Sequence, residues 1–341
     1  MAPSLKILIL GGAGAQNSYV ARDLARGGHS VSILTRDPSS EQAKSLSELQ
    51  NIKVLEGDTY DEKTLIRGFK GIDAVFVNTN GFAIGEKSEI YWGIRIYELA
   101  YISGVKHFIY SSLPYVSKKG GYDPKYRVPF VDGKAKVVEY LKSQPTDQMN
   151  WSILESGPYA DFFLLKELLP IRNADGVYVF TISIGEQGSM ALVSLDDLAW
   201  FARHMFENPE KFRGDELSVG IEHASGQRIV DAFTAVTGKP ASFVAKTREH
   251  NQQELPEFKL GTAHSPGFED PTLVTMREMF VPWWGIWEES IGNTGLWTRD
   301  YARLDAIKPD RIRTVEEWMR AVGYSENLQP RDILKTGLTS G

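Results

Sequence analysis

Residues 5–17 read Leu-Lys-Ile-Leu-Ile-Leu-Gly-Gly-Ala-Gly-Ala-Gln-Asn, and this stretch decides the fold. A short apolar run meets Gly11, Gly12 and Gly14 and passes directly into an amphipathic helical pattern that reaches Ala25. Glycines let the backbone turn tightly and approach a pyrophosphate, whose charge lies at the positive N-terminus of the next helix. The stretch therefore predicts the first strand–turn–helix unit of a dinucleotide-binding fold. A tight turn that binds no ligand is the alternative.

Short β-rich runs alternate with helical patterns through the first 155 residues. The runs are continuously apolar and do not alternate between apolar and polar residues. This pattern is typical of parallel strands buried on both faces of a sheet. It predicts an α/β protein with a Rossmann-type doubly wound parallel sheet. The expected strands lie at residues 5–10, 31–34, 53–55, 74–77, 108–110 and 151–154.

The rhythm changes after the last of these strands, where we predict a smaller α+β C-terminal substrate domain. Helices are expected at residues 195–207 and 226–236, and a Gly-Lys-Pro sequence ends the second one. Five of the eight tryptophans follow residue 268. We therefore expect an NADP-binding domain over residues 1–155 and a smaller substrate-binding region over residues 156–341, partly interleaved with the first.

The composition argues against several classes of protein. Lys and Arg number 38 against 44 Asp and Glu, and no dense basic run occurs, so we expect no nucleic-acid partner. Cysteine is absent and the six histidines lie far apart, so we expect no metal. No apolar run approaches the ~20 residues that span a bilayer, and the N-terminus lacks signal-peptide features. We expect no membrane association and a cytoplasmic location.

The end of the second strand carries the signal that separates NADP from NAD. Residues 34–37 read Leu-Thr-Arg-Asp. An arginine here pairs with the 2′-phosphate of NADP, whereas an acidic residue binds the ribose hydroxyls of NAD. We favour Arg36 and NADP(H), with Asp37 and NAD as the alternative if the register slips by one residue.

Further motifs follow in the order and spacing of a known family. The chain resembles the NmrA-like family, the atypical branch of the short-chain dehydrogenases that includes isoflavone-reductase-like enzymes and redox-sensing regulators. The resemblance covers nearly the whole chain and implies a Rossmann fold and a nicotinamide cofactor. Its motifs are the glycine turn, Thr35–Pro38, Gly57-Asp58, Tyr110–Ser112, Phe130–Lys134, Ile153–Tyr159, Val193–Leu198 and Ser225–Lys239.

Two positions depart from the family pattern. The third glycine position of the turn holds Asn17, whose side chain either fits between helix and strand or contacts phosphate itself. Glu155 replaces the arginine that the family usually carries in its Arg-x-Gly-x-Phe stretch, which alters the charge near the cofactor.

The proton-donating tyrosine of standard short-chain dehydrogenases is missing from its usual place. Their Tyr-x-x-x-Lys pair would put a tyrosine four residues before Lys134, where this chain has Phe130. A second match, from Tyr115 to Lys119, lies in a Gly/Lys-rich stretch that we expect to be a loop, so we interpret it as coincidence. Lys134 matches the lysine that the family places beside nicotinamide and ribose. There it would hold the ribose, stabilise developing negative charge or donate a proton, with an exposed helix-start lysine as the alternative.

Tyr159 follows the sixth strand and should lie near the nicotinamide, because ligands bind at the carboxyl ends of the strands. It is the second catalytic candidate, as a proton donor, with a packing role as the alternative. Asn78 and Ser111 end neighbouring strands and should border the same crevice. The predicted cofactor-binding residues are Gly11, Gly14, Ala15, Gln16, Asn17, Arg36, Asp58, Asn78, Asn80, Ser111, Lys134, Pro158 and Tyr159.

Three functions are compatible with the resemblance. We favour an NADPH-dependent reductase of a bulky hydrophobic or aromatic small molecule, such as a secondary metabolite. Trp283, Trp284 and Trp287 would bind this substrate, and residues 268–297 would close over it. Packing in the core of the small domain is the alternative for these tryptophans. The second function is a non-catalytic regulator that senses NADP(H) and binds a protein partner, and the third is a cofactor-dependent cyclase or isomerase.

Overall fold

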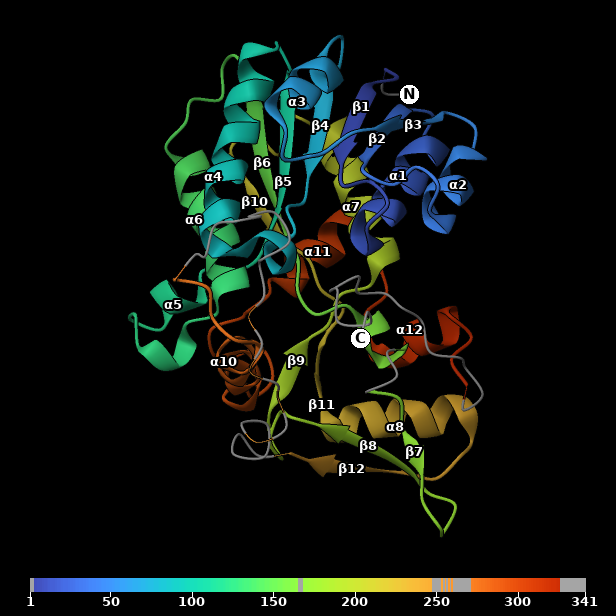
Figure 1. Ribbon diagram of the computed structural model, residues 1–341. Helices are drawn as coiled ribbons and strands as arrows, with labels where there is room; N and C mark the ends of the chain where they lie inside the picture. The colour runs from blue at the N-terminus through green and yellow to red at the C-terminus, as the bar shows by residue number, and fades with distance from the viewer. Residues whose placement is uncertain are drawn as a thin grey trace.

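A parallel seven-stranded sheet forms the centre of the computed structural model, which describes residues 3–164, 168–246, 253, 255, 257, 259 and 271–325. The strand order is β10-β6-β5-β4-β1-β2-β3 (Figure 1), which confirms the predicted doubly wound fold. The order reverses beside β1, so the carboxyl end of β1 is the point where such sheets bind ligands. The strands are β1 (Lys6–Leu10), β2 (Ser30–Thr35), β3 (Ile52–Glu56), β4 (Ala74–Val77), β5 (His107–Ser112), β6 (Asn150–Glu155) and β10 (Glu216–Ser218).

Helices cover both faces of this sheet, which explains why its strands are continuously apolar. Ile7 and Ile9 of β1 pack in the cluster formed with α1, α2 and α7, while Leu8 and Leu10 pack in the cluster formed with α3, α4 and α6. Neither face of β1 contacts water. The helices are α1 (Ala15–Arg26), α2 (Glu41–Ser47), α3 (Glu62–Phe69), α4 (Gly81–Ile102), α6 (Pro129–Lys142) and α7 (Leu195–Glu207).

Two helices after β6 begin and end where the sequence signals predict. α7 spans the predicted residues, and the hydroxyl group of Ser194 accepts a hydrogen bond from the backbone N–H of Asp197 at its start. α8 (Gly226–Thr237) stops at Gly238, which has a φ of 70°. A left-handed residue of this kind satisfies the last carbonyls of a helix, so the Gly-Lys-Pro stop signal is confirmed.

The chain after β6 contributes to two parts of the molecule. α7 packs against α1, and β10 extends the main sheet beyond β6. A small three-stranded sheet and α8 lie at the opposite end of the molecule (Figure 1). The domain boundary at residue 155 stays a prediction. The remaining elements are α5 (Val116–Lys119), η1 (Pro124–Tyr126), η2 (Ala160–Leu164), β7 (Ile171–Arg172), β8 (Tyr178–Ile182), β9 (Ser189–Ala191), β11 (His223–Ser225), β12 (Ala241–Ala245), α10 (Met276–Glu288), α11 (Tyr301–Ile307) and α12 (Val315–Ala321).

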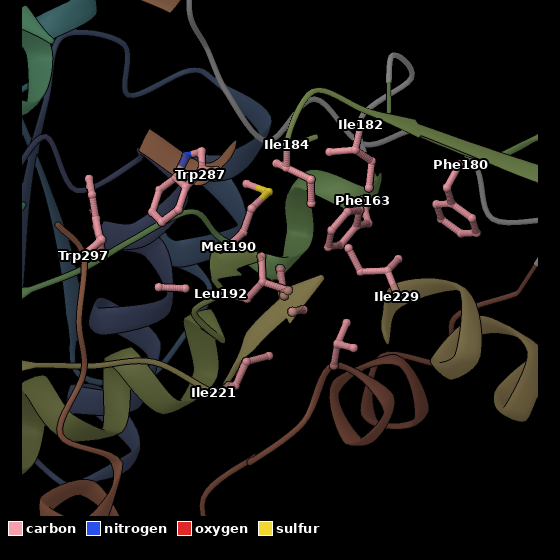
Figure 2. Packing of buried hydrophobic residues seen from close by; sticks show 14 of the residues in the cluster. Phe163, Phe180, Ile182, Ile184, Met190, Leu192, Ile221, Ile229, Trp287 and Trp297 are labelled. Atoms are coloured by element: carbon pink, nitrogen blue, oxygen red, sulfur yellow. The ribbon is translucent and has the colours of Figure 1, made fainter. Parts of the chain in front are cut away.

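The tryptophans of α10 form much of the core at this end. Trp287 is fully buried, and its ring centroid lies 4.8 Å from that of Trp297 and 5.1 Å from that of Trp283 (Figure 2). The burial of Trp283 and Trp287 favours the alternative of packing in the core, and their assignment to substrate binding stays a prediction. Trp284 is only partly buried, so its role stays a prediction. Of the segment expected to close over a substrate, residues 268–270 lie outside the described residues.

Candidate active site

The glycine turn lies at the carboxyl end of β1, where a sheet of this topology is expected to bind a ligand in a crevice. Gly11 has a φ of 68°, and a Cβ atom on Gly12 would lie 2.4 Å from the Cβ of Ile33 on β2. Only glycine therefore allows the turn to pack this closely on its neighbour strand. α1 begins after Gly14 with no side-chain cap and no acidic residue in its first turn. Such a helix N-terminus fits an anionic group such as a pyrophosphate.

Asn17 occupies the third position of the turn without opening it. Its side chain is buried, and Nδ2 donates to the backbone carbonyls of Leu10 at 2.8 Å and Gly11 at 3.0 Å. The side chain therefore fits between helix and strand, the first of the two alternatives for this position. Its amide group fastens the turn to the end of β1.

The two candidates for recognising the adenosine ribose differ in their surroundings. The Asp37 carboxylate accepts hydrogen bonds from the backbone N–H of Ser39 at 2.9 Å and from its hydroxyl group at 2.6 Å. Asp37 therefore supports the turn before α2, and Arg36, exposed like Asp37, directly follows β2. This arrangement favours Arg36 as the residue that faces a 2′-phosphate.

Asp58 and Asn80, two of the predicted cofactor contacts, are joined through Tyr60. The Asp58 carboxylate accepts from the backbone N–H of Tyr60 at 2.9 Å, and the Tyr60 hydroxyl group accepts from the backbone N–H of Asn80 at 3.0 Å. The Asn80 side chain also caps α4 by accepting from the N–H of Ala83. The loops after β3 and β4 are thereby held side by side along the crevice.

Lys134 lies on the buried side of α6, with 9 % of its surface exposed, so it is not an exposed helix-start lysine. Its Nζ donates to Asn78 Oδ1 at 3.1 Å and to the backbone carbonyl of Thr79 at 2.5 Å. The carboxylate of Glu89 lies 3.0 Å from the same Nζ. The contact of Lys134 with the residues after β4 therefore places a charged group at the carboxyl edge of the sheet.

A hydrogen-bonded row connects three segments that the sequence placed at the crevice. The Tyr159 hydroxyl group donates to Gln16 Oε1 at 2.9 Å, and Gln16 Nε2 donates to the Ser111 hydroxyl group at 2.7 Å. The neighbouring Pro158 carbonyl accepts from the backbone of Val193. Burial raises the pKa of Tyr159, so its phenol keeps its proton at neutral pH.

An aromatic wall stands at the start of α6, one turn from Lys134. Phe130 lies where standard short-chain dehydrogenases have tyrosine, and its ring centroid is 4.6 Å from that of Phe82 and 5.8 Å from that of Phe280. Trp283 closes the back of this group at 5.2 Å from Phe130. Phe82 and Phe280 keep part of their surface exposed, so the wall can receive a flat apolar ligand.

The second Tyr-x-x-x-Lys match does not lie in a plain loop, and that expectation is corrected. Tyr115 begins the one-turn helix α5, because the four residues after it form a single helical turn that ends at Gly120. Tyr115 and Lys119 line a separate cavity of about 580 Å³ together with Glu155 and Glu216. The residues lining this cavity do not include Lys134, Tyr159 or Ser111.

Sequence reasoning missed four residues at the site: Thr79, Phe82, Glu89 and Phe280. A signal for Glu89 exists, since it lies at helical spacing from Gly85, Gly93 and Tyr97, all on the buried face of α4. A charged residue on such a face needs a partner.

Within the part of the chain that the structure describes, no group of three or more His, Asp or Glu side chains could hold a metal ion. No helix among these same residues is long and apolar enough to cross a membrane.

Three features define a Rossmann-fold protein with a candidate site at its switch point. They are the sheet order, the glycine turn before the uncapped helix α1, and Lys134 of α6, which is buried against the residues after β4. The model of the NmrA-like family matches residues 3–280. The chain therefore belongs to the NmrA-like family, as its motifs predict.

Three known proteins illustrate this relationship. An NmrA-like family domain-containing oxidoreductase of Aspergillus hancockii is 28% identical over 251 residues, which cover 70% of this chain and 74% of the relative. NmrA, a negative transcriptional regulator solved in complex with NADP, has a TM-score of 0.73 at 18% identity, covering 94% of this chain and 95% of NmrA. The NADPH-dependent quinone oxidoreductase QOR2 of Escherichia coli, solved with NADPH, has a TM-score of 0.68 at 18% identity, covering 93% and 99%. The two structures show the shared fold.

Proposed function

We propose that the protein is an NADPH-dependent reductase of a bulky hydrophobic or aromatic small molecule, such as a secondary metabolite. The observation that carries this proposal is the position of Lys134 on α6, whose buried Nζ contacts the residues after β4. One helical turn earlier on α6, Phe130 packs with Phe82 and Phe280 in the aromatic wall. A positive charge beside an apolar surface suits a reaction in which negative charge develops on a flat substrate. The similarity to an Aspergillus hancockii oxidoreductase supports the same class of activity.

The residues along the crevice fit NADP(H) from one end to the other. The glycine turn and the N-terminus of α1 would hold the pyrophosphate, and Arg36 would pair with the 2′-phosphate. Asn78 and Lys134 would hold the ribose at the nicotinamide end. When bound, the cofactor supplies a hydride to the substrate.

The remaining side chains would position the substrate and supply a proton. Phe82 and Phe280 would hold the flat face of the substrate and exclude water from the reacting atoms. Lys134 would stabilise the negative charge that develops on the substrate as it is reduced. The Tyr159 phenol, which keeps its proton at neutral pH, would then protonate the reduced product.

The loss of NADPH absorbance in the presence of a panel of quinones, aromatic ketones and aromatic imines tests this proposal. We expect the wild-type protein to oxidise NADPH with at least one of these classes, and the variant Lys134→Met to do so far more slowly. A protein that binds NADPH but oxidises it with no member of the panel contradicts the reductase proposal. Product formed without loss of NADPH would indicate a cyclase or isomerase.

One observation favours a second function, that of a regulator which senses NADP(H). Phe130 stands where standard short-chain dehydrogenases have their proton donor, and NmrA, which shares the fold, is a negative transcriptional regulator. A sensor must bind the oxidised and reduced cofactors with different affinities, because only a differential affinity can shift a conformational equilibrium. Calorimetric titration with NADP⁺ and with NADPH measures this difference directly.

A further inference from the structure

Glu89 is a fully buried carboxylate on α4 that contacts the candidate catalytic lysine. Its Oε1 lies 3.0 Å from Lys134 Nζ and accepts a hydrogen bond from the Thr79 hydroxyl group at 2.8 Å. We infer that Glu89 is a positioning residue that keeps Lys134 as an ammonium ion and directs its Nζ toward the end of β4. This inference rests on the proposed function of the same site.

The space around the carboxylate is made by glycines from two helices. A Cβ atom on Gly81 would lie 2.4 Å from Glu89 Oε2, and one on Gly133 would lie 2.8 Å from it. Both distances are shorter than van der Waals contact, so any larger residue at either position would displace the carboxylate. Gly85, with a φ of 75°, interrupts α4 one turn before Glu89. Two positions that leave no room for a Cβ atom and one left-handed glycine therefore surround this one acidic side chain.

The hydrogen bonds around Glu89 fit an ionised carboxylate. The Thr79 hydroxyl group gives its proton to Glu89, so the Tyr110 hydroxyl group, 3.0 Å away, donates to Thr79. Lys134 Nζ donates to Asn78 Oδ1, to the Thr79 carbonyl and to the Thr79 hydroxyl oxygen, and its charge pairs with Glu89. Each donor therefore has an acceptor, and Nζ has a single favourable direction.

The charges of Glu89 and Lys134 stabilise each other. Burial raises the pKa of Glu89, and the ammonium of Lys134 and the hydrogen bond from Thr79 oppose this rise. The other ionisable groups that face the carboxylate are Glu86 on the same helix, Tyr60 from the loop after β3 and Tyr110 from β5. None of these three is a cation, so Lys134 is the counter-ion of Glu89.

The pairing restricts what Lys134 can do in the reaction. A buried ammonium whose carboxylate partner is removed is strongly destabilised, which favours the neutral amine. With Glu89 in place, the ammonium has a counter-ion and serves as a fixed positive charge for the ribose and for the substrate. Among the roles considered for Lys134, the structure therefore assigns the electrostatic one and not proton donation.

The variant Glu89→Gln tests this assignment through the pH dependence of NADPH binding and of kcat and KM. We expect the wild-type Kd for NADPH to stay nearly constant from about pH 6 to about pH 9, because Glu89 pairs with the charge of Lys134. In the variant, the Kd should rise about tenfold or more across the same range and kcat should fall in parallel. A matched control is Glu86→Gln, one turn earlier on α4, whose carboxylate contacts Arg127 and Lys136 and not Lys134. This control should keep the wild-type pH profile.

A flat, wild-type pH profile for folded Glu89→Gln would overturn the inference and reduce Glu89 to a structural role. If Glu89→Gln does not fold, Thr79→Val removes one hydrogen bond to the carboxylate and should shift the profile in the same direction by less. An unshifted Thr79→Val profile would then overturn the inference. The binding measurement requires no turnover, so it distinguishes a failure of this inference from a failure of the reductase proposal.

Discussion

Arg299 and Glu155 form a buried ion pair that joins the segment after α10 to the end of β6, with Nη1 2.6 Å from Oε1. The Arg299 guanidinium also donates to the backbone carbonyls of Ser156 at 2.6 Å and Val219 at 2.8 Å. The family resemblance implies an arginine where this chain has Glu155. Arg299, which comes from a distant segment of the chain, places its guanidinium group beside Glu155. The pair thereby supports the loop that leads to Tyr159.

Removing either charge of this pair should destabilise the fold. We expect Glu155→Gln or Arg299→Met to lower the free energy of unfolding by about 3–5 kcal/mol, because the other charge stays buried without a partner. Urea unfolding measures this change, and the double variant should lose less than the sum of the two. The exposed carboxylate of Glu210, paired with Arg213 on the surface, offers a control that should cost under about 1 kcal/mol as Glu210→Gln. Equal small losses at both sites would show that the buried pair has no special role.

Arg36 should carry the preference for NADP over NAD. Arg36→Ala removes charged hydrogen bonds to the 2′-phosphate and should weaken NADPH binding by about 1–3 kcal/mol, with NADH binding nearly unchanged. Titration calorimetry with both cofactors checks this, and Asp37→Asn serves as the control that should leave the preference intact. An equal loss for both cofactors would remove Arg36 from the site.

Much of the fold could be predicted because its signals are local. The glycine turn, the continuous apolar strands and the Ser194 and Gly238 helix signals each depend on a few consecutive residues. The physical causes of these signals are the backbone freedom of glycine, burial on both faces of the sheet and the unsatisfied hydrogen-bonding groups at helix ends. Each cause acts over the same few consecutive residues. The position of Lys134 at the cofactor crevice was predicted through the family resemblance.

The residues that surround Lys134 could not be predicted in the same way. Glu89, Phe82 and Phe280 reach the site from α4 and α10, and the contact of Phe280 with Phe130 spans two helices far apart in the sequence. A tryptophan-rich run such as 283–287 indicates an apolar element but not which ring faces a ligand. In this protein Trp287 is fully buried in the core, and the smaller Phe82 and Phe280 keep part of their surface exposed.

His107 should make the fold sensitive to mild acid. Burial lowers its pKa to about 4, and its Nε2 lies 3.0 Å from the Ser152 hydroxyl group. An unfolded chain has a histidine pKa of about 6.5, so the folded state favours the neutral ring and this stability is complete above that pH. It is lost as the pH falls from about 6.5 toward about 4.

Urea unfolding near pH 7 and near pH 5 measures the contribution of His107. We expect the wild type to lose about 2 kcal/mol more than His107→Gln between these two conditions. Identical pH dependence in the two proteins would show that folding does not lower the pKa of the imidazole.

Tyr159 should act as the proton donor. Burial keeps its phenol protonated, and its hydroxyl group lies in the row that reaches Gln16 and Ser111. Tyr159→Phe should lower kcat by about 100-fold or more while NADPH binding changes little, since general acid catalysis contributes at this level. Tyr324→Phe removes another buried phenol, which bonds the Phe163 carbonyl away from the crevice, and should leave kcat unchanged. A Tyr159→Phe enzyme within a few-fold of wild type would mean that the ring serves only for packing.

The most direct test of the account is the rate of a single turnover with and without the charge of Lys134. Protein saturated with NADPH is mixed rapidly with a reducible aromatic substrate, and the loss of NADPH absorbance is followed for the wild type and for Lys134→Met. The variant keeps the aliphatic stem of the side chain but leaves the buried Glu89 without its counter-ion, so NADPH binding by the variant is measured first to show that it is folded. We expect rapid oxidation by the wild type and a rate lower by about 100-fold or more in the variant, because a preorganised charge at the reacting atoms is lost. A Lys134→Met protein that binds NADPH and oxidises it as fast as the wild type would contradict the account.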